Sequence, residues 1–386
     1  MNTTNLWRAL ALPALLPMAL YCGCNASHQS QAQAQAQAQP TPQPAPQATT
    51  KPFITVWKGV AGEPLKIPIV GNYSVTWYAA DAPNDRHTET VSITSESLLA
   101  HPYTFTPPRD GEYVVEAGPE GVEYMRMWVF DGEDNEYTFD SSSALLRVVQ
   151  FGKVKWQNMA TMFASCANMT FADTIDTPDL SAVRDMQGMF VGCERFNQPL
   201  EHWDVSQVTN MGGMLSGCTI FNQPLERWNV SRVEYMSGMF DNTTAFNQPL
   251  ERWDVSQVKK MNELFYNCSA FNQPLAGWDV SQVETMENMF CGCSSFNQPL
   301  EVWNVSRVTN MNCMFDGCAA FNQPLGKWDV SHVEEMIYMF RGCVAFNQPL
   351  DQWKVKDKLW MRGMFEDCPA GNQPAVKGWK DAGDIE

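Results

Sequence analysis

A repeated unit of 25 residues constrains the fold of this chain more than any other feature. The unit contains Phe-Asn-Gln-Pro-Leu and recurs seven times without a gap between residues 196 and 370. Its Phe recurs from Phe196 to Phe346 and its Trp from Trp203 to Trp353, always 25 residues apart. Spacing that never drifts indicates that each unit forms one coil of a solenoid and stacks on the coil before it.

Each unit has two halves with different periodicity. In the first half, Trp and Val are two residues apart, as in Trp203 and Val205, which is typical of one face of a strand. In the second half, the pattern Val-x-x-Met-x-x-Met-Phe, which begins for example at Val233, has the spacing of one face of a helix. We therefore predict an α/β solenoid with a short strand and a short helix in every coil.

The residues that flank the second half favour the same helix. A Ser precedes it and suits an N-cap, and Glu234, Glu284 and Glu334 lie three residues after their Ser, as in a capping box. Gly or Asn occupies the far end, from Gly192 to Gly342, where a helix C-cap requires a left-handed backbone. These signals predict a helix of about three turns.

Several invariant positions have more than one interpretation. The Asn of each signature is predicted to form a hydrogen-bonded ladder along the stack, the alternative being exposed amides without a role. Each Trp either fills the coil interior or stacks on sugars at the surface. The Asp or Asn after each Trp either caps a turn or binds calcium. The predicted ladder consists of Asn197, Asn222, Asn247, Asn272, Asn297, Asn322 and Asn347.

The cysteines are predicted to be packing residues. Eight of them share one register from Cys166 to Cys368, and Thr243 takes that position once, which a metal array or an obligate disulfide would not tolerate. Cys291 and Cys313 lie outside the register, and a disulfide between them is the alternative to two free thiols.

The N-terminus resembles a bacterial lipoprotein signal. Arg8 precedes an apolar run over 9–20 that is too short to span a bilayer, and Cys24 follows the small residue Gly23. We predict lipidation at Cys24, with a plain cleaved signal peptide as the alternative. The Gln-, Ala- and Pro-rich segment up to residue 50 cannot form a core and is predicted to be a disordered tether.

Residues 51–150 differ from the repeats in their sequence pattern. The runs that begin at Ile54, Tyr73 and Glu112 alternate like strands and are separated by Gly and Pro, which predicts an all-β sandwich. The fold class is therefore mixed, an all-β sandwich followed by an α/β solenoid. The predicted domains are a signal peptide at 1–23, a lipid-anchored tether at 24–50, the sandwich at 51–150, the solenoid at 151–379 and a tail at 380–386. Within the solenoid, two imperfect coils precede the seven regular units, and a degenerate cap ends it.

Composition and motifs exclude several classes of function. The formal net charge of −17 argues against nucleic-acid binding, which needs clustered Lys and Arg. The five His fit no zinc-hydrolase spacing, and the chain contains neither a nucleophile motif nor a phosphate-binding glycine loop. We therefore predict that the protein is not an enzyme and uses no cofactor or metal.

Binding specificity should lie where the units differ. The variable positions are the pair before each Trp and the flanks of the second half, which together are predicted to form one mixed-charge stripe suited to a protein partner. The candidate partner-binding residues are Glu201, His202, Glu226, Arg227, Glu251, Arg252, Lys259, Lys260, Lys327, Glu334 and Glu335.

The repeat, over roughly residues 150–375, resembles the BspA-like leucine-rich repeat surface proteins of bacteria, in the branch with the signature Phe-Asn-Gln-Pro-Leu-x-x-Trp-Asp-Val-Ser. The preceding domain resembles a PKD-like β-sandwich in 101–103 and 111–115, although the family's Trp-Gly-Asp-Gly turn is degraded at 77–81. The resemblance implies a leucine-rich-repeat-like solenoid on an exported surface lipoprotein, and some relatives are adhesins.

The expected function is that of a non-enzymatic adhesin or protein-binding scaffold, lipid-anchored to the cell envelope and exposed at the surface. The expected partner is a host extracellular-matrix or cell-surface protein, and the lipid anchor is the expected contact with the membrane. A carbohydrate-binding module and a structural spacer without a partner are the alternatives.

Overall fold

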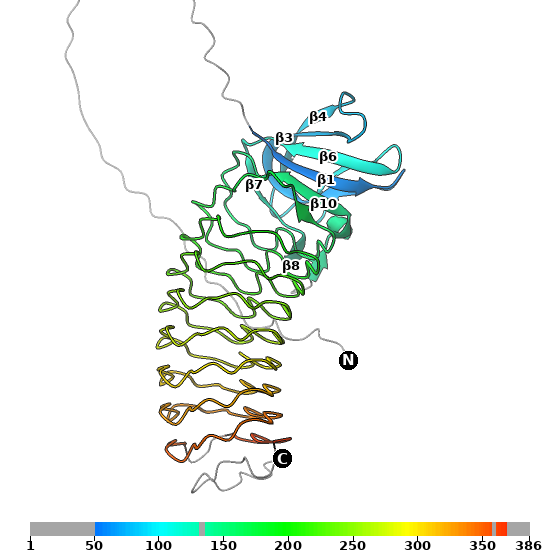
Figure 1. Cartoon of the computed structure of the whole chain (residues 1–386). Coiled ribbons are helices and arrows are strands. Elements are labelled where there is room, and N and C mark those ends of the chain that lie inside the picture. The colour runs from blue at the N-terminus through cyan, green and yellow to red at the C-terminus, as the bar shows by residue number, and fades with distance from the viewer. Residues whose placement is uncertain (1–50, 131–135, 357–359, 369–386) are drawn as a thin grey trace, which may run out of the picture. The chain divides into compact units, whose positions relative to one another are not determined.

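The computed structural model describes residues 51–130, 136–356 and 360–368. Two segments of the expected organisation, the signal peptide and the tether with Cys24, lie outside the described residues, as does the C-terminal part of the predicted cap. Residues 48–386 belong to one compact unit, which contains both the sheet domain and the repeat coils. Figure 1 shows the coils following the sheet domain in chain order.

The domain that precedes the coils is built from short strands, most of them antiparallel. The runs that begin at Ile54, Tyr73 and Glu112 lie within β1, β3 and β6. The elements are β1 (Phe53–Gly59), β2 (Leu65–Ile67), β3 (Ile69–Ala79), β4 (His87–Ile93), β5 (Tyr103–Phe105), β6 (Gly111–Ala117), β7 (Val122–Met125), β8 (Trp128–Phe130), β9 (Glu136–Thr138), η1 (Asp140–Ala144), β10 (Leu145–Gln150) and β11 (Thr170–Phe171).

One sheet of seven strands organises this domain. Its order is β11-β10-β1-β6-β3-β4, with β7 also paired to β3. Alternation along the strands buries one face, for example Val75 in β3 and Val115 in β6. The small sheet of β2 and β5 packs on the same core through Ile67 and Phe105, whose ring stacks on Trp77 at a centroid distance of 4.4 Å.

The sheet continues directly into the first coil. β10 pairs with β11 in parallel, and β11 already belongs to the coil region. The backbone N–H of Met127 donates to the carbonyl of Thr161 at 3.0 Å, and the Thr161 hydroxyl donates to the carbonyl of Trp128 at 2.7 Å. Phe53 of β1 meets Trp156 edge to face at 5.0 Å. The first coil therefore packs on the sheet domain through backbone hydrogen bonds and a shared apolar core.

The predicted helix in each coil is wrong, and with it the α/β fold class. The fold is rich in β structure, and within the described residues the one helical element is η1, a 3-10 helix of five residues. Where a helix was expected, the Met189 N–H donates to the carbonyl of Met186 at 3.1 Å, which closes a turn. The N–H of Gly188 donates to Gly212 in the next coil at 2.8 Å. These bonds replace the i→i+4 bonds of a helix.

Left-handed backbone conformations explain why no helix forms. Each coil has two positions with positive φ, four residues apart, such as Gly188 at 58° and Gly192 at 70°. A right-handed helix cannot contain such residues, whereas tight turns can. The Gly or Asn column that was predicted to cap a helix is therefore left-handed as expected, but it lies in a turn. The structure describes no helix long and apolar enough to cross a membrane.

The first half of each coil also differs from the prediction. Residues around Trp203 and Val205 form no strand, and the parallel bridges between coils lie in the other half, from the Asp185–Asn210 bridge to the Glu335–Trp360 bridge. The predicted N-cap Ser is held in a turn instead. The N–H of Ser231 donates to Asn229 Oδ1 at 3.2 Å, and the Asp or Asn after each Trp from Trp203 to Trp328 caps a turn in this way.

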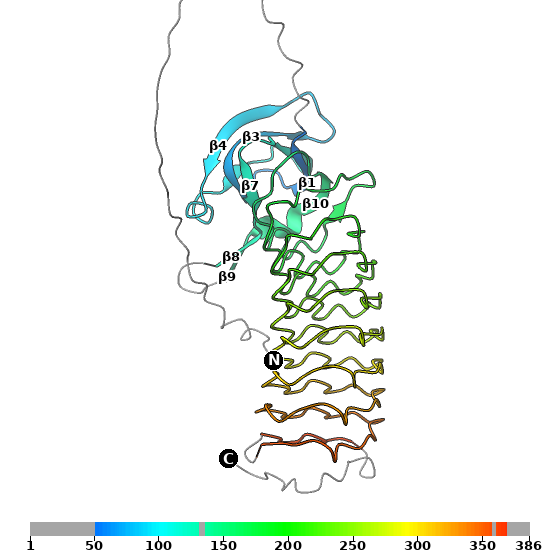
Figure 2. The same ribbon diagram turned by 90° about the vertical axis from the view of Figure 1, so that its left-hand side faces the viewer.

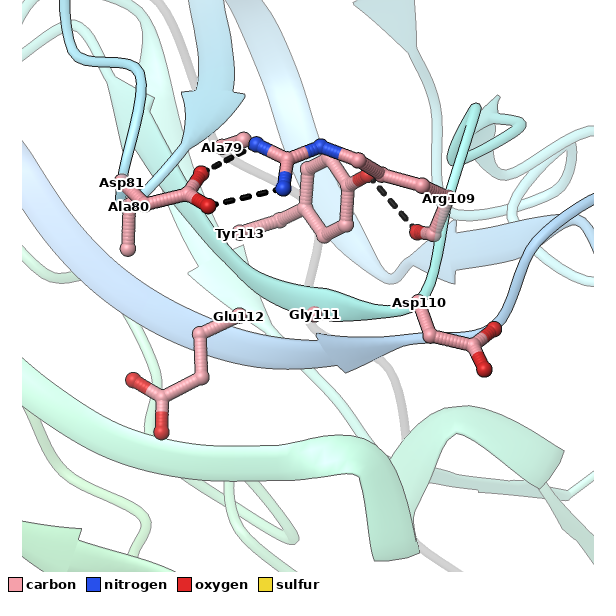
Figure 3. A pocket seen from close by; sticks show the side chains of 8 residues that line it. All are labelled: Ala79, Ala80, Asp81, Arg109, Asp110, Gly111, Glu112 and Tyr113. Atoms are coloured by element: carbon pink, nitrogen blue, oxygen red, sulfur yellow. Dashed lines mark hydrogen bonds and ion pairs between the residues drawn. The ribbon is translucent and has the colours of Figure 1, made fainter.

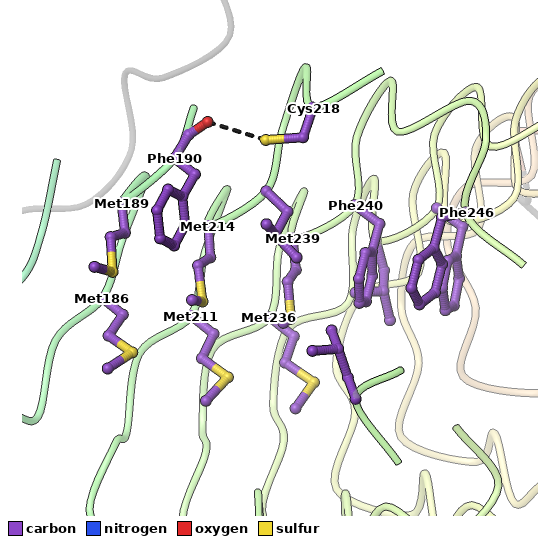
Figure 4. Close-up of a cluster of buried hydrophobic side chains, with 14 of the residues drawn as sticks. Met186, Met189, Phe190, Met211, Met214, Cys218, Met236, Met239, Phe240 and Phe246 are labelled. Carbon is purple, nitrogen blue, oxygen red and sulfur yellow. Dashed lines mark hydrogen bonds between the residues drawn. The ribbon is translucent and has the colours of Figure 1, made fainter. Parts of the chain in front are cut away.

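Columns of identical side chains fill the interior of the stack. Figure 4 shows Met186, Met211 and Met236 in one column and the second Met of each coil in another. The Phe rings of the signature stack at about 6 Å with nearly parallel planes, as in Phe196 and Phe221. These columns form one continuous core with the sheet domain.

The Trp residues are core residues that also bind the neighbouring coil. From Trp203 to Trp353 each is at most 6% exposed. The Trp278 indole N–H donates to the carbonyl of Leu250 at 2.9 Å, and the same bond, 28 residues back along the chain, recurs from Trp228 to Trp353. Side chains buried in this way cannot stack on a sugar at the surface.

The Cys register is a hydrogen-bonding column as well as a packing column. The Cys293 thiol donates to the carbonyl of Phe265 at 2.9 Å, and Cys218, Cys268 and Cys318 make the equivalent bond. Thr243, the one exception, donates its hydroxyl to Leu215 at 2.9 Å. Figure 4 shows this bond for Cys218. The position therefore requires a small donor, which explains why Thr can replace Cys.

The Asn ladder is formed through one oxygen of each side chain. Asn272 Oδ1 accepts the backbone N–H of Asn297 at 2.9 Å and the side-chain amide of Gln298 at 3.0 Å. The same pair of bonds runs from Asn197, which accepts from Asn222 and Gln223, to Asn322. Each Asn therefore fixes the corner of the next coil.

Replacing Cys293 should separate packing from hydrogen bonding. We expect Cys293→Ala to destabilise the chain by about 1–2 kcal/mol, because it removes both the thiol donor and its volume. Cys293→Thr should cost less than half as much, since Thr243 already makes this bond in an equivalent coil. Urea unfolding followed by Trp fluorescence measures both, and equal losses for the two variants would show that the thiol bond contributes nothing.

Candidate binding surface

The pairs of residues that precede each Trp form an exposed column, which we call the corner column. Each pair lies in a turn at the corner of its coil, next to a buried Trp. Its side chains reach solvent, with Arg252 81% and Lys327 77% exposed. The pairs are 201–202, 226–227, 251–252, 276–277, 301–302, 326–327 and 351–352.

Ion pairs between adjacent coils neutralise part of the corner column. Arg252 lies 3.2 Å from Glu226, and Lys327 lies 3.0 Å from Glu301. His202 contacts Glu201 of its own pair at 3.2 Å. Such exposed pairs contribute little to stability, about 0–1 kcal/mol each. They remain able to exchange their partner for a charged group of another molecule.

The second set of variable residues forms a separate column, which we call the flank column, at 234–235, 259–260, 284–285, 309–310 and 334–335. Lys259 pairs with Glu234 of the preceding coil, and Lys356 pairs with Glu334 at 3.0 Å. The three predicted capping boxes are absent because the helix that they would start does not form, and Glu234 and Glu334 bind Lys. Glu335 accepts an amide hydrogen bond from Asn310 at 3.3 Å.

The corner and flank columns make their contacts separately. Among the described residues, no hydrogen bond or ion pair links a member of one column to a member of the other. Four of the predicted residues, Arg227, Glu251, Lys260 and Glu335, have no ion-pair partner within the described ranges, and Glu335 is held by amide hydrogen bonds from Asn310 and Asn312 instead. The corner column therefore provides the larger share of charged groups that are free to bind.

A third variable surface was not predicted, because its residues were assigned to a helix. It consists of the side chains between and after the two Met positions, and we call it the turn face. Its members are Ser216, Asp241, Asn262, Glu263, Tyr266, Glu287, Cys291, Asn312, Cys313, Asp316, Tyr338 and Arg341. The repeated glycines at 188, 213 and 238 were the available signal, since glycine at fixed spacing indicates turns.

Half-buried carboxyl groups of the turn face have raised pKa values. Burial raises the pKa of Glu263 to about 7, with further increases from the nearby charges of Asp241 and Glu287. Burial likewise raises the pKa of Asp241 to about 6, although hydrogen bonds from Ser216 and Asn242 favour its ionised form. Acids stacked on adjacent coils therefore hold protons more tightly than exposed carboxylates do.

The rest of the turn face is held by its own contacts. Arg341 forms a two-pronged ion pair with Asp316, and its guanidinium lies 4.5 Å from the centre of the Tyr338 ring. Cys291 and Cys313 are both free and half-buried, and burial raises the pKa of both thiols. Protonated thiols of this kind are poor nucleophiles.

The sheet domain contains a cavity of about 270 Å³ between the β3–β4 and β5–β6 loops. Figure 3 shows the Arg109 guanidinium donating to the Asp81 carboxylate across it, with one hydrogen bond at 2.7 Å. The Tyr113 hydroxyl donates to the Arg109 carbonyl. The Arg109 guanidinium lowers the pKa of Asp81. The other acids of the wall also have partners, because Asp110 accepts the N–H of Ala61 and Glu112 lies 3.6 Å from Arg147.

The last three residues of the degraded turn at 77–81 line this cavity, and their contacts show what the turn does. Asp81 ties the β3–β4 loop to the loop before β6 through Arg109. The charged residues that line the cavity therefore hold its loops together. Within the described residues, no group of three or more His, Cys, Asp or Glu side chains is placed to hold a metal ion.

The fold and the surface together define a class of protein, a stacked-coil repeat protein with a sheet domain at the start of the stack. The chain belongs to the family described as "Mycoplasma protein of unknown function, DUF285", which matches residues 157–278 and 260–379 and so covers more than half of the chain. The resemblance is thereby confirmed at the level of a repeat family of BspA-like type, whereas no match supports a leucine-rich repeat or a PKD-like domain. No curated protein and no solved structure matches the chain.

Removing the Glu263 carboxyl should change how stability depends on pH. The folded-state pKa of Glu263, about 7, lies above its ordinary value of 4.5, so the folded chain binds the proton more tightly between these values. The contribution of this group is therefore most favourable below pH 4.5 and declines as pH rises through about 7. We expect Glu263→Gln to raise the thermal midpoint above that of wild type at about pH 8, by about 2–4 °C, and to match it near pH 4.5.

Differential scanning calorimetry at both pH values measures this effect. Glu251→Gln is the matched control, because Glu251 is exposed and has no ion-pair partner among the described residues. A midpoint of Glu263→Gln that stays at or below the wild-type value across the pH range would contradict the assignment of a strained, buried carboxylate.

Proposed function

We propose that this chain is a non-enzymatic scaffold that binds other proteins through the variable columns of its repeat coils. The observation that carries the proposal is the division of roles within each unit. The invariant Phe, Trp and Met side chains are buried, and the signature Asn is engaged in the ladder. A partner that approaches the coils therefore meets chiefly the positions at which the units differ.

Regular spacing of the corner column supports a macromolecular partner. Six of the seven pairs carry at least one charged residue, the exception being Ala276 and Gly277. An extended partner can therefore contact several of them together, and weak contacts that act together increase avidity. The mixture of Glu and Arg, with Arg227 and Glu251 unpaired, favours a partner that also carries both charges. A host extracellular-matrix or cell-surface protein has this character.

The proposal extends to the location of the protein. The apolar run before Cys24 and the Pro-rich segment after it support an exported lipoprotein of the BspA-like leucine-rich repeat type, anchored to the cell envelope and exposed at the surface. In this proposal the sheet domain corresponds to the PKD-like sandwich that the sequence resemblance suggested. An adhesin is the role that such a location favours for a protein-binding scaffold.

A carbohydrate-binding module is the second candidate. The burial of all seven repeat Trp side chains weakens it, because sugars stack on exposed aromatic rings. A glycan site would have to use the sheet domain or another ring of the coils, such as Trp360, which is 63% exposed. A spacer without any partner is the third candidate. Unlike the other two, it should bind neither a protein nor a glycan in a binding assay.

Charge reversal of the corner column tests the binding proposal. The compact unit 48–386 is presented to immobilised fibronectin, fibrinogen and a glycan panel, and bound protein is quantified. We expect binding to a matrix protein, and Arg227→Glu, Arg252→Glu and Lys327→Glu combined should weaken it at least about tenfold, which is about 1.4 kcal/mol. The matched control combines Lys51→Glu, Lys58→Glu and Lys153→Glu, which alters net charge equally on exposed residues of the sheet domain and its junction.

The outcomes separate the three candidates. Binding that only the corner variant loses supports the scaffold, whereas glycan binding that both variants retain supports the carbohydrate module. If wild type binds nothing above background at any salt concentration tested, the spacer is the remaining candidate and the proposal is wrong.

The anchor is tested in cells. We expect Cys24→Ala to abolish incorporation of radiolabelled palmitate and to release the protein from the membrane fraction, because the thiol is the attachment point of the lipid. Cys22→Ala is the control and should leave both unchanged. Unaltered membrane retention of Cys24→Ala would contradict the anchor without affecting the binding proposal.

A further inference from the structure

β4 is an edge strand without a neighbour on its outer side. It ends the order of the seven-stranded sheet, and it lies at the outer edge of that sheet in Figures 1 and 2. All seven of its residues are exposed or half-buried. Within the described residues its backbone pairs with β3 alone. The N–H and C=O groups that point away from β3 therefore remain open to another strand.

β4 lacks three common devices by which edge strands prevent such pairing. It contains neither Lys nor Pro, and its pairing with β3 runs from His87 to Ile93 without a register shift. In contrast, the β1–β10 and β3–β7 pairs in the same sheet are interrupted by irregularities. Lys, Pro and bulges are the common protections of an edge.

The two ionisable residues of β4, His87 and Glu89, are held against their own sheet. The His87 ring stacks on Trp77 at a centroid distance of 4.2 Å, and Glu89 accepts a hydrogen bond from the Tyr103 hydroxyl at 2.7 Å. The opposite side of the strand carries Thr88, Thr90 and Ser92, all of them exposed. A strand that pairs with β4 therefore meets hydroxyl groups on one face of the sheet. On the other face it meets His87 and Glu89, which already have partners in their own domain.

The sequence of β4 is complementary to itself about its central residue. If two copies of β4 pair in antiparallel fashion with Thr90 opposite Thr90 of the second copy, then Thr88 faces Ser92 and Glu89 faces Val91. All seven residues find a partner, and hydroxyl pairs of this kind stabilise sheets. A shift of one residue would place Glu89 opposite Glu89 of the second copy, where like charges repel.

We propose that β4 joins two copies of this chain by antiparallel strand pairing centred on Thr90, which extends the sheet across a twofold axis. A single seven-residue edge buries less surface than a standard interface, so the dimer should be weak, with a dissociation constant of about 10–1000 μM. The proposal does not rest on the binding surfaces of the coils. A chain that binds no matrix protein can still dimerise in this way.

Disulfide trapping tests the register. We expect Thr90→Cys in the purified chain to form a covalent dimer under mild oxidation, because the two sulfur atoms would face each other across the axis. Thr88→Cys alone should give no more dimer than wild type, since its equivalent lies opposite Ser92, whereas Thr88→Cys combined with Ser92→Cys should again cross-link. Non-reducing gel electrophoresis measures the yield, and wild type controls for the native thiols.

Edge protection tests the association itself. Sedimentation equilibrium of wild type should show the average mass rising toward that of a dimer as concentration approaches about 1 mM. Thr90→Lys should weaken the dimer at least about tenfold, because it adds a common edge protection to an exposed side chain. The control is Ser74→Lys, at the exposed position of β3 that pairs with Thr90, which should leave both mass and thermal midpoint unchanged.

Two results would overturn the proposal. One is a wild-type chain that stays monomeric up to this concentration, with no more cross-linking of Thr90→Cys than of Thr88→Cys. The other is a dimer that Thr90→Lys leaves intact while its fold, checked by thermal midpoint, is unchanged, because such a dimer would use another surface.

Discussion

The repeat region depends on a backbone hydrogen bond that leaves each coil and ends on the next. Alternate amides of the second half donate to the following coil, as Phe190 does to Met214 at 2.9 Å. The amides between them close tight turns within their own coil. The alternate amides therefore have a partner only while the following coil is present, so a single coil has no stable structure.

Side chains also bond along the stack, in the opposite direction, because the Trp indole and the Cys thiol donate to the preceding coil. The Trp indole, the Cys thiol and the Asn oxygen all bond to an adjacent coil, at 28, 28 and 25 residues of separation. Because the same atoms repeat, one geometry satisfies all the coils. This explains why the seven regular units keep one length, and why the buried columns stay nearly constant while exposed positions vary.

Much of this could be predicted from the sequence. The 25-residue spacing predicts that each unit forms one coil of a stack. The recurrence of Phe, Trp and Met at the same positions of every unit predicts which side chains form the core. Spacing alone could not distinguish turns from a helix in the second half. Turns that close every three or four residues bury apolar side chains at the same spacing as one face of a helix does. Gly188, Gly213 and Gly238 carried the distinguishing signal, but Glu263, Asn288, Cys313 and Tyr338 occupy that column further along and obscure it. The turn face was missed for this reason.

The sheet domain also has a consequence for how the stack is assembled. The first coil docks on a finished sheet through β11, Thr161 and Trp156, so the sheet presents an ordered surface at the start of the repeats. Each later coil finds its predecessor already in place when the chain emerges from its N-terminal end. Winding can therefore proceed in one direction, coil by coil, with the sheet as its nucleus and with no need for distant parts of the chain to meet.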